Sequence, residues 1–439
     1  MLPLHNSNSQ HYPFLLESVA SGTAQSRYDI LFCDPQQCLL LSGEGRLFLD
    51  ERPLAGIDFL DAFEQQWREA ARGQSSDISL PFYGGWFVYL GYELAAQIEP
   101  SLTLHSDPKL PIAMAVRIPA AIIRDHEQRC LYFVADDEAQ QRFSHYESQL
   151  DRVSGVDDTT VDFDSIEEDP AERFIDGVNR IKRYIYEGDI FQVNLSRGWR
   201  ATSSKPLNPT RLYQRLRKSN PAPFSAIACI GAQTIVSSSP ERLVEVRDRW
   251  VQTRPIAGTR PRSSSTFHDQ ALASELMENI KERAEHIMLI DLERNDLGRI
   301  CLPGTIEVNE LMGRESYAHV HHIVSNVRGK LKGGITPAAV IRAVFPGGTI
   351  TGCPKVRCME IIDELEGVAR GAYTGSIGYV NHSGDMDLNI LIRTLIADDH
   401  SVNFRAGGGI VADSVAEREI EETRSKAKGL LLALQSRDG

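Results

Sequence analysis

Basic residues are outnumbered by acidic ones in this sequence. Its 439 residues include 47 lysines and arginines against 60 aspartates and glutamates, so the formal net charge is -13. Proteins that bind nucleic acid need basic surfaces that neutralise phosphates. The composition therefore argues against a nucleic-acid partner.

The sequence also has no apolar run that approaches 18 residues, the length that a membrane-spanning helix requires. Its first residues, MLPLHNSNSQ, include neither a basic stretch nor an apolar stretch, so we expect no signal peptide. No CxxC pair occurs among the seven cysteines, and their spacing matches no common zinc site. We expect reduced thiols and a cytoplasmic protein.

One acidic segment, DDTTVDFDSIEEDP at 157–170, has seven carboxylates and no basic residue. Such a segment repels itself and buries little, so we predict a solvated linker. It divides the chain into an N-terminal part (1–156) and a C-terminal part (171–435).

Both parts combine hairpins with long helices. Short turns join apolar strands at 37–50, 118–135, 226–238 and 376–406, where 386–397 reads as one strand. Short connections imply antiparallel pairing. Helical spacing appears at 57–72, 172–188, 274–295 and 415–434. The pattern predicts an α+β fold, with helices on the outer faces of antiparallel sheets.

Two of these helices carry paired glutamates, Glu282 with Glu285 and Glu419 with Glu422. Residues three apart share a helix face, so the four carboxylates could converge on a divalent cation, and Mg²⁺ suits oxygen ligands. Glutamate-rich helices are, however, usually solvated, and Glu422 with Lys426 is an ordinary i,i+4 salt bridge. The pattern by itself does not decide between these readings.

Glycine-rich segments offer a second kind of site. FPGGTITGCPK is not a P-loop, because Cys353 and Pro354 separate Gly352 from Lys355. Its free backbone amides suit a carboxylate or, equally, a tight structural turn. Gly407-Gly408-Gly409 lets backbone approach a ligand closely. No nucleophilic triad is visible, and the roles of His319, His321 and His322 stay ambiguous.

From Phe174 to Leu432 the chain resembles the chorismate-using enzymes that include anthranilate synthase component I and aminodeoxychorismate synthase component I. The resemblance is carried by DIFQVNLS, SSSPERL, TRPIAGTRPR, ERAEHIMLIDLERNDLGR, HHIVS, FPGGTITGCPKVRCMEIIDELE, YTGSIGY, IRT and AGGGIVADS. It implies a large sandwich of two antiparallel β-sheets, face to face, with helices outside. It also implies that 171–435 is the chorismate-binding catalytic domain.

The resemblance assigns roles to particular residues. Glu285 and Glu422 match ligands of Mg²⁺, and Glu282 and Glu419 match carboxylates that reach the ion through water. Glu241 matches the acid that protonates the departing ring hydroxyl, and His322 the active-site histidine. The residues that match substrate contacts are Thr351, Tyr373, Arg393, Gly407, Gly409 and Lys426.

Gln192 stands where water-using relatives carry a lysine base. Water without a base is a poor nucleophile, whereas ammonia needs no activation, so the resemblance implies an aminating enzyme. No glutaminase motif is present, and we expect the ammonia to come from a glutamine amidotransferase subunit.

The resemblance leaves two products open. PGGTITG, GSIGY, AGGGIVADS and SRYDIL favour aminodeoxychorismate synthase, the enzyme of para-aminobenzoate and folate biosynthesis. Ala257 in PIAGT favours anthranilate synthase, because aminodeoxychorismate synthases commonly carry a nucleophilic lysine there. We expect 4-amino-4-deoxychorismate as the product, with anthranilate as the alternative. A non-catalytic sensor is a more remote reading, since FLLES (Leu16, Glu17, Ser18) resembles a tryptophan-binding segment of the family.

Overall fold

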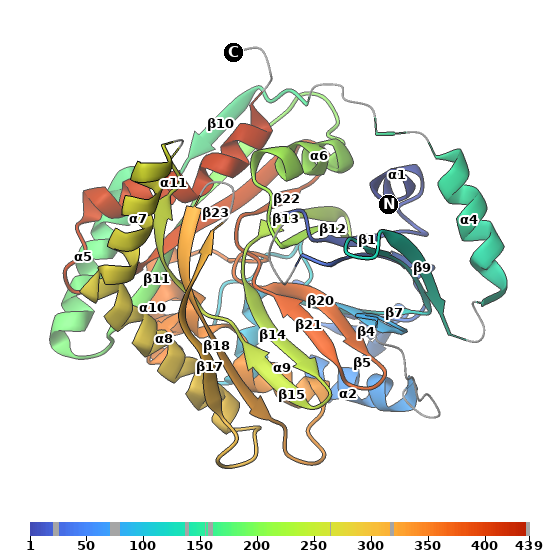
Figure 1. Ribbon diagram of the computed structural model, residues 1–439, viewed down its shortest axis with the longest axis horizontal. Coiled ribbons are helices and arrows are strands. Elements are labelled where there is room, and N and C mark those ends of the chain that lie inside the picture. Colours follow the sequence, from blue (N-terminus) through green and yellow to red (C-terminus); the bar gives the residue numbers. More distant parts are fainter. Residues whose placement is uncertain are drawn as a thin grey trace.

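The computed structural model describes residues 1–20, 26–70, 80–136, 140–153, 155–156, 161–263, 265–316 and 320–435. Within these residues the strands form two sheets in which every neighbouring pair is antiparallel. The sheets lie face to face and helices cover their outer sides (Figure 1). The predicted α+β sandwich is therefore confirmed.

Sheet A contains 11 of the described strands. In pairing order they are β10 (Ser165–Glu168), β11 (Gln192–Thr202), β23 (Ser401–Ile410), β22 (Thr394–Ala397), β13 (Gln233–Ser239), β12 (Phe224–Ile230), β1 (Phe14–Glu17), β2 (Tyr28–Cys33), β8 (Ala120–Asp125) and β9 (Cys130–Ala135), and β19 (Gly352–Cys353) also pairs with β11.

Sheet B contains 12 of the described strands. In pairing order they are β16 (Ile256–Pro261), β18 (Val320–Lys330), β15 (Trp250–Thr253), β14 (Arg242–Arg247), β21 (Met386–Asn389), β20 (Ser376–Asn381), β6 (Gly85–Leu90), β7 (Ala113–Ile118), β3 (Cys38–Leu41), β4 (Leu47–Leu49) and β5 (Arg52–Leu54), and β17 (Glu307–Ser316) also pairs with β18.

The helices of the described chain are α1 (Leu2–Ser7), α2 (Phe59–Ala70), α3 (Ala95–Ile98), α4 (Phe143–Arg152), α5 (Ala171–Glu187), α6 (Pro209–Ser219), α7 (Thr266–Glu278), α8 (Ile280–Gly298), α9 (Pro337–Val344), α10 (Lys355–Glu366) and α11 (Ala416–Leu434), with the 3₁₀ turns η1 (Tyr92–Leu94), η2 (Gln140–Arg142) and η3 (Gly348–Ile350). None of them combines the length and the apolar character that crossing a membrane requires. The seven cysteines are unpaired.

Aromatic residues from both sheets meet in the central core. Phe14 of sheet A stacks on Phe87 of sheet B with 3.8 Å between ring centroids, and Phe32 meets Phe82 edge to face. All four rings are buried. Truncating a buried phenylalanine to alanine costs about 3–5 kcal/mol, so Phe87→Ala would loosen the contact between the sheets.

Strands from before and after the acidic segment share both sheets, since β1 pairs with β12 and β6 pairs with β20. The described part of that segment begins at residue 161 and is largely exposed, as its charge predicts. Ser165–Glu168 nevertheless forms β10, a strand that the sequence did not indicate. The division of the chain at 157–170 stays a prediction.

Two predicted elements are wrong in detail. The helix expected at 274–295 is two helices, because Asn279 leaves helical geometry and its side chain caps α8 by accepting a bond from the Glu282 amide at 3.1 Å. The strand expected at 386–397 is also two: β21 belongs to sheet B and β22 to sheet A. Arg393, between them, has the left-handed φ of 51° that turns the chain from one sheet to the other.

Candidate active site

Two connections cross side by side from one sheet to the other. Glu241 lies between β13 and β14, and Arg393 between β21 and β22. The Ile390 amide donates to the Glu241 carbonyl at 2.9 Å, and the Ser238 amide donates to the Arg393 carbonyl at 3.1 Å. This double crossing holds a carboxyl and a guanidinium group at one place between the sheets.

Glu241 is buried there, and its carboxylate accepts a hydrogen bond from the Thr349 hydroxyl at 2.8 Å. Burial raises the pKa of Glu241 to about 7, although the Thr349 bond and the nearby charges of Lys426 and Arg393 act in the opposite direction. The side chain therefore holds its proton close to neutral pH, as a general acid requires.

His322 is buried on β18, and its Nδ1 lies 3.2 Å from the carbonyl oxygen of Gly258. A carbonyl only accepts, so Nδ1 carries the hydrogen. Burial lowers the pKa of His322 to about 3, and the charges of Arg393 and Lys426 add to the shift. The imidazole is neutral at physiological pH and faces the same two cations as Glu241.

His321 of the same cluster has different neighbours. His321 Nδ1 lies 2.7 Å from the Ser316 hydroxyl, and its Nε2 lies 3.1 Å from Asp269, whose pKa the Arg262 guanidinium holds far below its usual range. His321 thus belongs to a separate hydrogen-bonded set. His319 lies outside the described residues.

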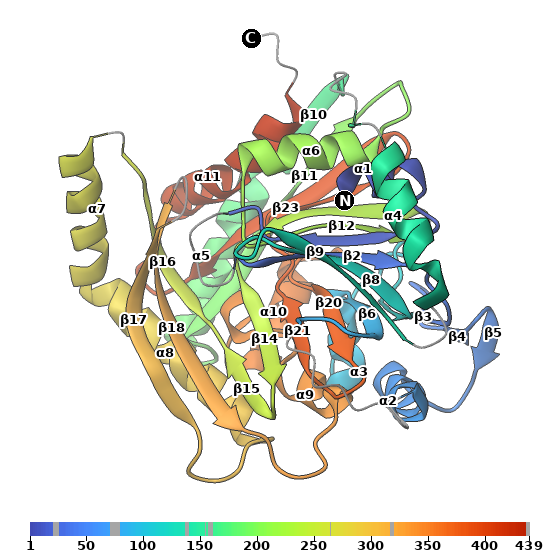
Figure 2. The same ribbon diagram turned by 45° about the vertical axis from the view of Figure 1, so that its right-hand side comes forward.

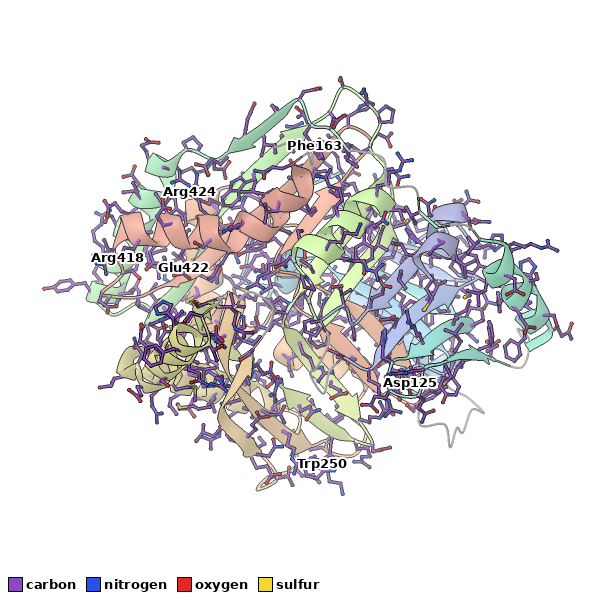
Figure 3. All side chains as sticks on the ribbon, turned by 45° about the horizontal axis from the view of Figure 1, so that its top comes forward. Asp125, Phe163, Trp250, Arg418, Glu422 and Arg424 are labelled. Atoms are coloured by element: carbon purple, nitrogen blue, oxygen red, sulfur yellow. The ribbon has the colours of Figure 1, made fainter. Side chains whose placement is uncertain are left out.

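Lys426 and two of the predicted metal ligands lie over the glycine strand β23. The Lys426 ammonium donates to the Gly407 carbonyl at 2.9 Å and to Glu422 at 2.8 Å. A Cβ on Gly408 would lie 3.2 Å from a Glu422 oxygen and 3.7 Å from a Glu419 oxygen, so both carboxylates gather over this glycine. Figure 3 shows Glu422 on the edge of α11 that faces α7 and α8, with Arg424 on the opposite edge.

The other two predicted ligands lie on α8. Glu282 reaches Gly258, where a Cβ would lie 2.9 Å from its Oε2, and Glu282 also accepts from Arg260 at 3.2 Å. Glu285 follows one turn later and is half-buried. In Figure 2 this group, α7 and α8 with β16, β17 and β18, stands together at one side of the molecule, away from β10 and α6.

In the described part of the chain, no three carboxylates, histidines or cysteines stand close enough together to hold one metal ion. The four glutamates form two pairs of oxygen donors, which is the ligand type of Mg²⁺. Their convergence on one ion stays a prediction.

Tyr373, one of the predicted substrate contacts, packs against a buried arginine, Arg370. It donates to Glu366 at 2.6 Å and to the Asn194 carbonyl at 2.7 Å, and it lies 5.4 Å from the ring centroid of Tyr373. Burial raises the pKa of Tyr373 to about 12, so its phenol stays protonated. The Thr351 hydroxyl donates within its own loop to the Gly347 carbonyl at 2.9 Å.

Gln192 and Ala257 are both buried. Gln192 begins β11, and its amide nitrogen occupies the space in which a side chain at Gly409 would sit. Ala257 follows Ile256, whose backbone amide bonds the Glu241 carboxylate. Position 257 is therefore next to the buried acid.

Leu16, Glu17 and Ser18 line a different space, a cavity of about 240 Å³ between the sheets. Glu17 accepts from the Tyr213 hydroxyl at 2.7 Å and pairs with Arg217 at 3.2 Å. Arg242, the residue after Glu241, forms another wall of the cavity. The cavity and the double crossing are thus neighbours along the chain.

Sequence reasoning missed a second buried acid, Glu293 on α8. Burial raises its pKa to about 8, and a Cβ on Gly348 would lie 3.5 Å from its Oε1. Gly348 directly precedes Thr349, the partner of Glu241. The helix after this turn, α10, begins at Lys355 with Pro354 as its N-cap residue, and Lys355 pairs with Asp296 at 2.6 Å. In the sequence, Glu293 is visible only as one of the two acidic residues in the string LERND (292–296).

Comparison with known proteins gives consistent matches. The family described as chorismate binding enzyme matches residues 13–432. An anthranilate synthase component I-like protein of Synechocystis is 45% identical over 81% of this chain and 74% of its own length. Aminodeoxychorismate synthase component 1 of Bacillus subtilis is 37% identical over 98% of this chain and 93% of its own length. The crystal structure of anthranilate synthase component I from Streptococcus pneumoniae has a TM-score of 0.82 and 31% identity, and the match covers 93% of each chain.

Proposed function

Because the chain belongs to the chorismate-binding enzyme family, we propose that it aminates chorismate to 4-amino-4-deoxychorismate, a step of para-aminobenzoate and folate biosynthesis. The observation that carries the proposal is Glu241, a buried carboxyl that stays protonated near neutral pH between two cationic side chains. Such a group can release hydroxide from a ring as water, which amination of chorismate requires.

Glu241 acts first as the acid. The bond from ring carbon 4 to its hydroxyl breaks, and the Glu241 proton completes the departing water. A bond forms between the ammonia nitrogen and ring carbon 4, and the proton that ammonia loses returns to the Glu241 carboxylate. Atoms and charge then balance as chorismate plus ammonia giving aminodeoxychorismate plus water.

Gln192 supports ammonia as the nucleophile. Its amide accepts no proton near neutral pH, so it cannot activate water as a basic side chain would. His322 is neutral and its Nδ1 hydrogen is directed to the Gly258 carbonyl, which leaves Nε2 as the ring's acceptor. Ammonia needs no base until after it has attacked.

The cationic and hydroxyl groups at the predicted substrate contacts suit a dicarboxylate substrate. Lys426 supplies positive charge beside the Gly407 carbonyl, and Arg393 and the protonated phenol of Tyr373 suit a second carboxylate. Mg²⁺ held by Glu285 and Glu422, with Glu282 and Glu419 acting through water, would add charge for a substrate carboxylate. Substrate carboxylates near Glu241 would themselves favour its protonated form.

Ala257 favours the alternative product, anthranilate, which would form if ammonia attacked ring carbon 2 and pyruvate then left. Without a lysine at this position no covalent adduct can protect carbon 2. The two readings share the acid, the metal and the substrate.

Product analysis tests the proposal. The chain is incubated with chorismate, Mg²⁺ and ammonium at alkaline pH, and the products are identified by their masses in mass spectrometry. We expect aminodeoxychorismate, which retains the enolpyruvyl group; anthranilate as the main product would refute the proposed reaction. Glutamine alone should give no product until a glutamine amidotransferase subunit is added.

A further inference from the structure

Two buried amide side chains on β11 have bare oxygen atoms. Gln192 and Asn194 are 8% and 9% exposed, and among the described residues neither the Gln192 Oε1 nor the Asn194 Oδ1 has a hydrogen-bond partner. Buried polar atoms are nearly always paired. Two unpaired acceptors so close along one strand point to a ligand that donates hydrogen bonds.

The two side chains share one face of the sheet, because residues two apart in a strand point the same way. Asn194 is held in place by its backbone: its amide donates to the Thr351 carbonyl at 2.9 Å, and its carbonyl accepts from Arg370 at 2.7 Å. Both anchors belong to segments that carry predicted substrate contacts. These bonds fix the backbone of Asn194 relative to both segments.

Gly409 on β23 is a neighbour of both residues. It lies directly opposite Asn194 in the pairing of β11 with β23, and a Cβ there would collide with Gln192 Nε2. Because position 409 has no side chain, the Gln192 amide can occupy this space. Any larger residue would displace that amide from the strand face that it shares with Asn194.

The two side-chain oxygens select their ligand by chemistry. Carboxylates and carbonyls only accept hydrogen bonds, so they cannot satisfy two bare oxygens. Ammonia is compact and has three N–H donors, and ammonium has four. Water has two donors, but neither amide can take its proton and so activate it.

We propose that Gln192 and Asn194 bind the ammonia that attacks chorismate, with their side-chain oxygens as acceptors above Gly409. The inference rests on the proposed amination and assigns its nucleophile a position. Asn194 is then a positioning residue for ammonia.

Kinetics with ammonium as the nitrogen source test the role of Asn194. Asn194→Leu has a similar shape but no acceptor, and loss of one such bond should raise the KM for ammonium about tenfold. The KM for chorismate should stay within about twofold of wild type. Asn194→Asp keeps an acceptor and should recover a low KM for ammonium. Asn403→Leu is the matched control, because Asn403 lies on the partner strand opposite Arg200, away from Gln192 and Asn194. An unchanged KM for ammonium in Asn194→Leu, with product still formed, overturns the inference and leaves the proposed function standing.

Binding without turnover separates the two claims. In the wild-type chain with labelled side-chain amides, ammonium chloride should shift the Gln192 and Asn194 signals saturably, and sodium chloride should not. Saturable shifts in a chain that makes no aminated product would support the ammonia site and refute the proposed reaction. Absence of a shift that is specific for ammonium refutes the site whatever the product.

Discussion

Glu241→Gln tests the centre of the mechanism. The substitution preserves the size of the side chain and leaves an oxygen that can accept from Thr349, but it removes the proton that the leaving hydroxyl needs. We expect kcat to fall about 10²- to 10⁴-fold, with chorismate binding retained. In the wild type, log kcat should fall by one unit per pH unit above the pKa of about 7.

The same substitution should change how stability depends on pH. Burial raises the pKa of Glu241 from 4.5 to about 7. Between these values the folded chain keeps a proton that the unfolded chain has released. The stabilising contribution of Glu241 is therefore complete below pH 4.5 and is lost as the pH rises through about 7, which amounts to about 3 kcal/mol.

Urea unfolding at pH 5 and pH 8 measures this difference. Between the two pH values the wild type should lose roughly 2–3 kcal/mol more unfolding free energy than Glu241→Gln. Glu69→Gln, the control, changes an exposed glutamate on α2. Its unfolding free energy should change with pH as that of the wild type does. Parallel pH profiles for wild type and Glu241→Gln would show that the buried carboxyl is not protonated as argued.

Three further substitutions or titrations address the rest of the site. Glu285→Gln or Glu422→Gln should abolish Mg²⁺-dependent turnover while circular dichroism stays unchanged, and activity that persists in excess chelator would contradict the metal assignment. His322 should remain neutral down to about pH 4 in an NMR titration of its ring, because its pKa is lowered to about 3; protonation near pH 6 would mean that the site is open to water. Wild-type protein should form no covalent substrate adduct. Ala257→Lys places an amine beside Glu241 and should produce a mass-detectable adduct in an aminodeoxychorismate synthase, whereas in an anthranilate synthase it should mainly reduce activity.

The hairpins were predictable because their signals are local. Turn residues between two short apolar runs define the pairs β3–β4, β8–β9 and β12–β13, and all three occur. The crossing at 390–393 was not predictable in this way. Ile390 and Leu391 are apolar and buried, and Ile392 extends the apolar run up to Arg393, so 386–397 reads as one strand although the chain changes sheets.

In the candidate site, too, residues in local motifs were predictable and residues whose role depends on the fold were not. Resemblance identified Glu241 and His322 by their motifs, and the structure brings both near Arg393 and Lys426. Asn194 was missed because its significance depends on an unpaired oxygen and on the register with β23, which no spacing along the sequence reveals.

The mixing of early and late strands has a consequence for synthesis. β6 ends at Leu90, but its partner β20 begins only at Ser376. At about 5–20 residues per second, the ribosome needs on the order of tens of seconds to supply that partner. Until then the nascent chain carries an apolar strand with an open edge, so chaperones have a long interval in which to act and a chain released early leaves that edge uncovered.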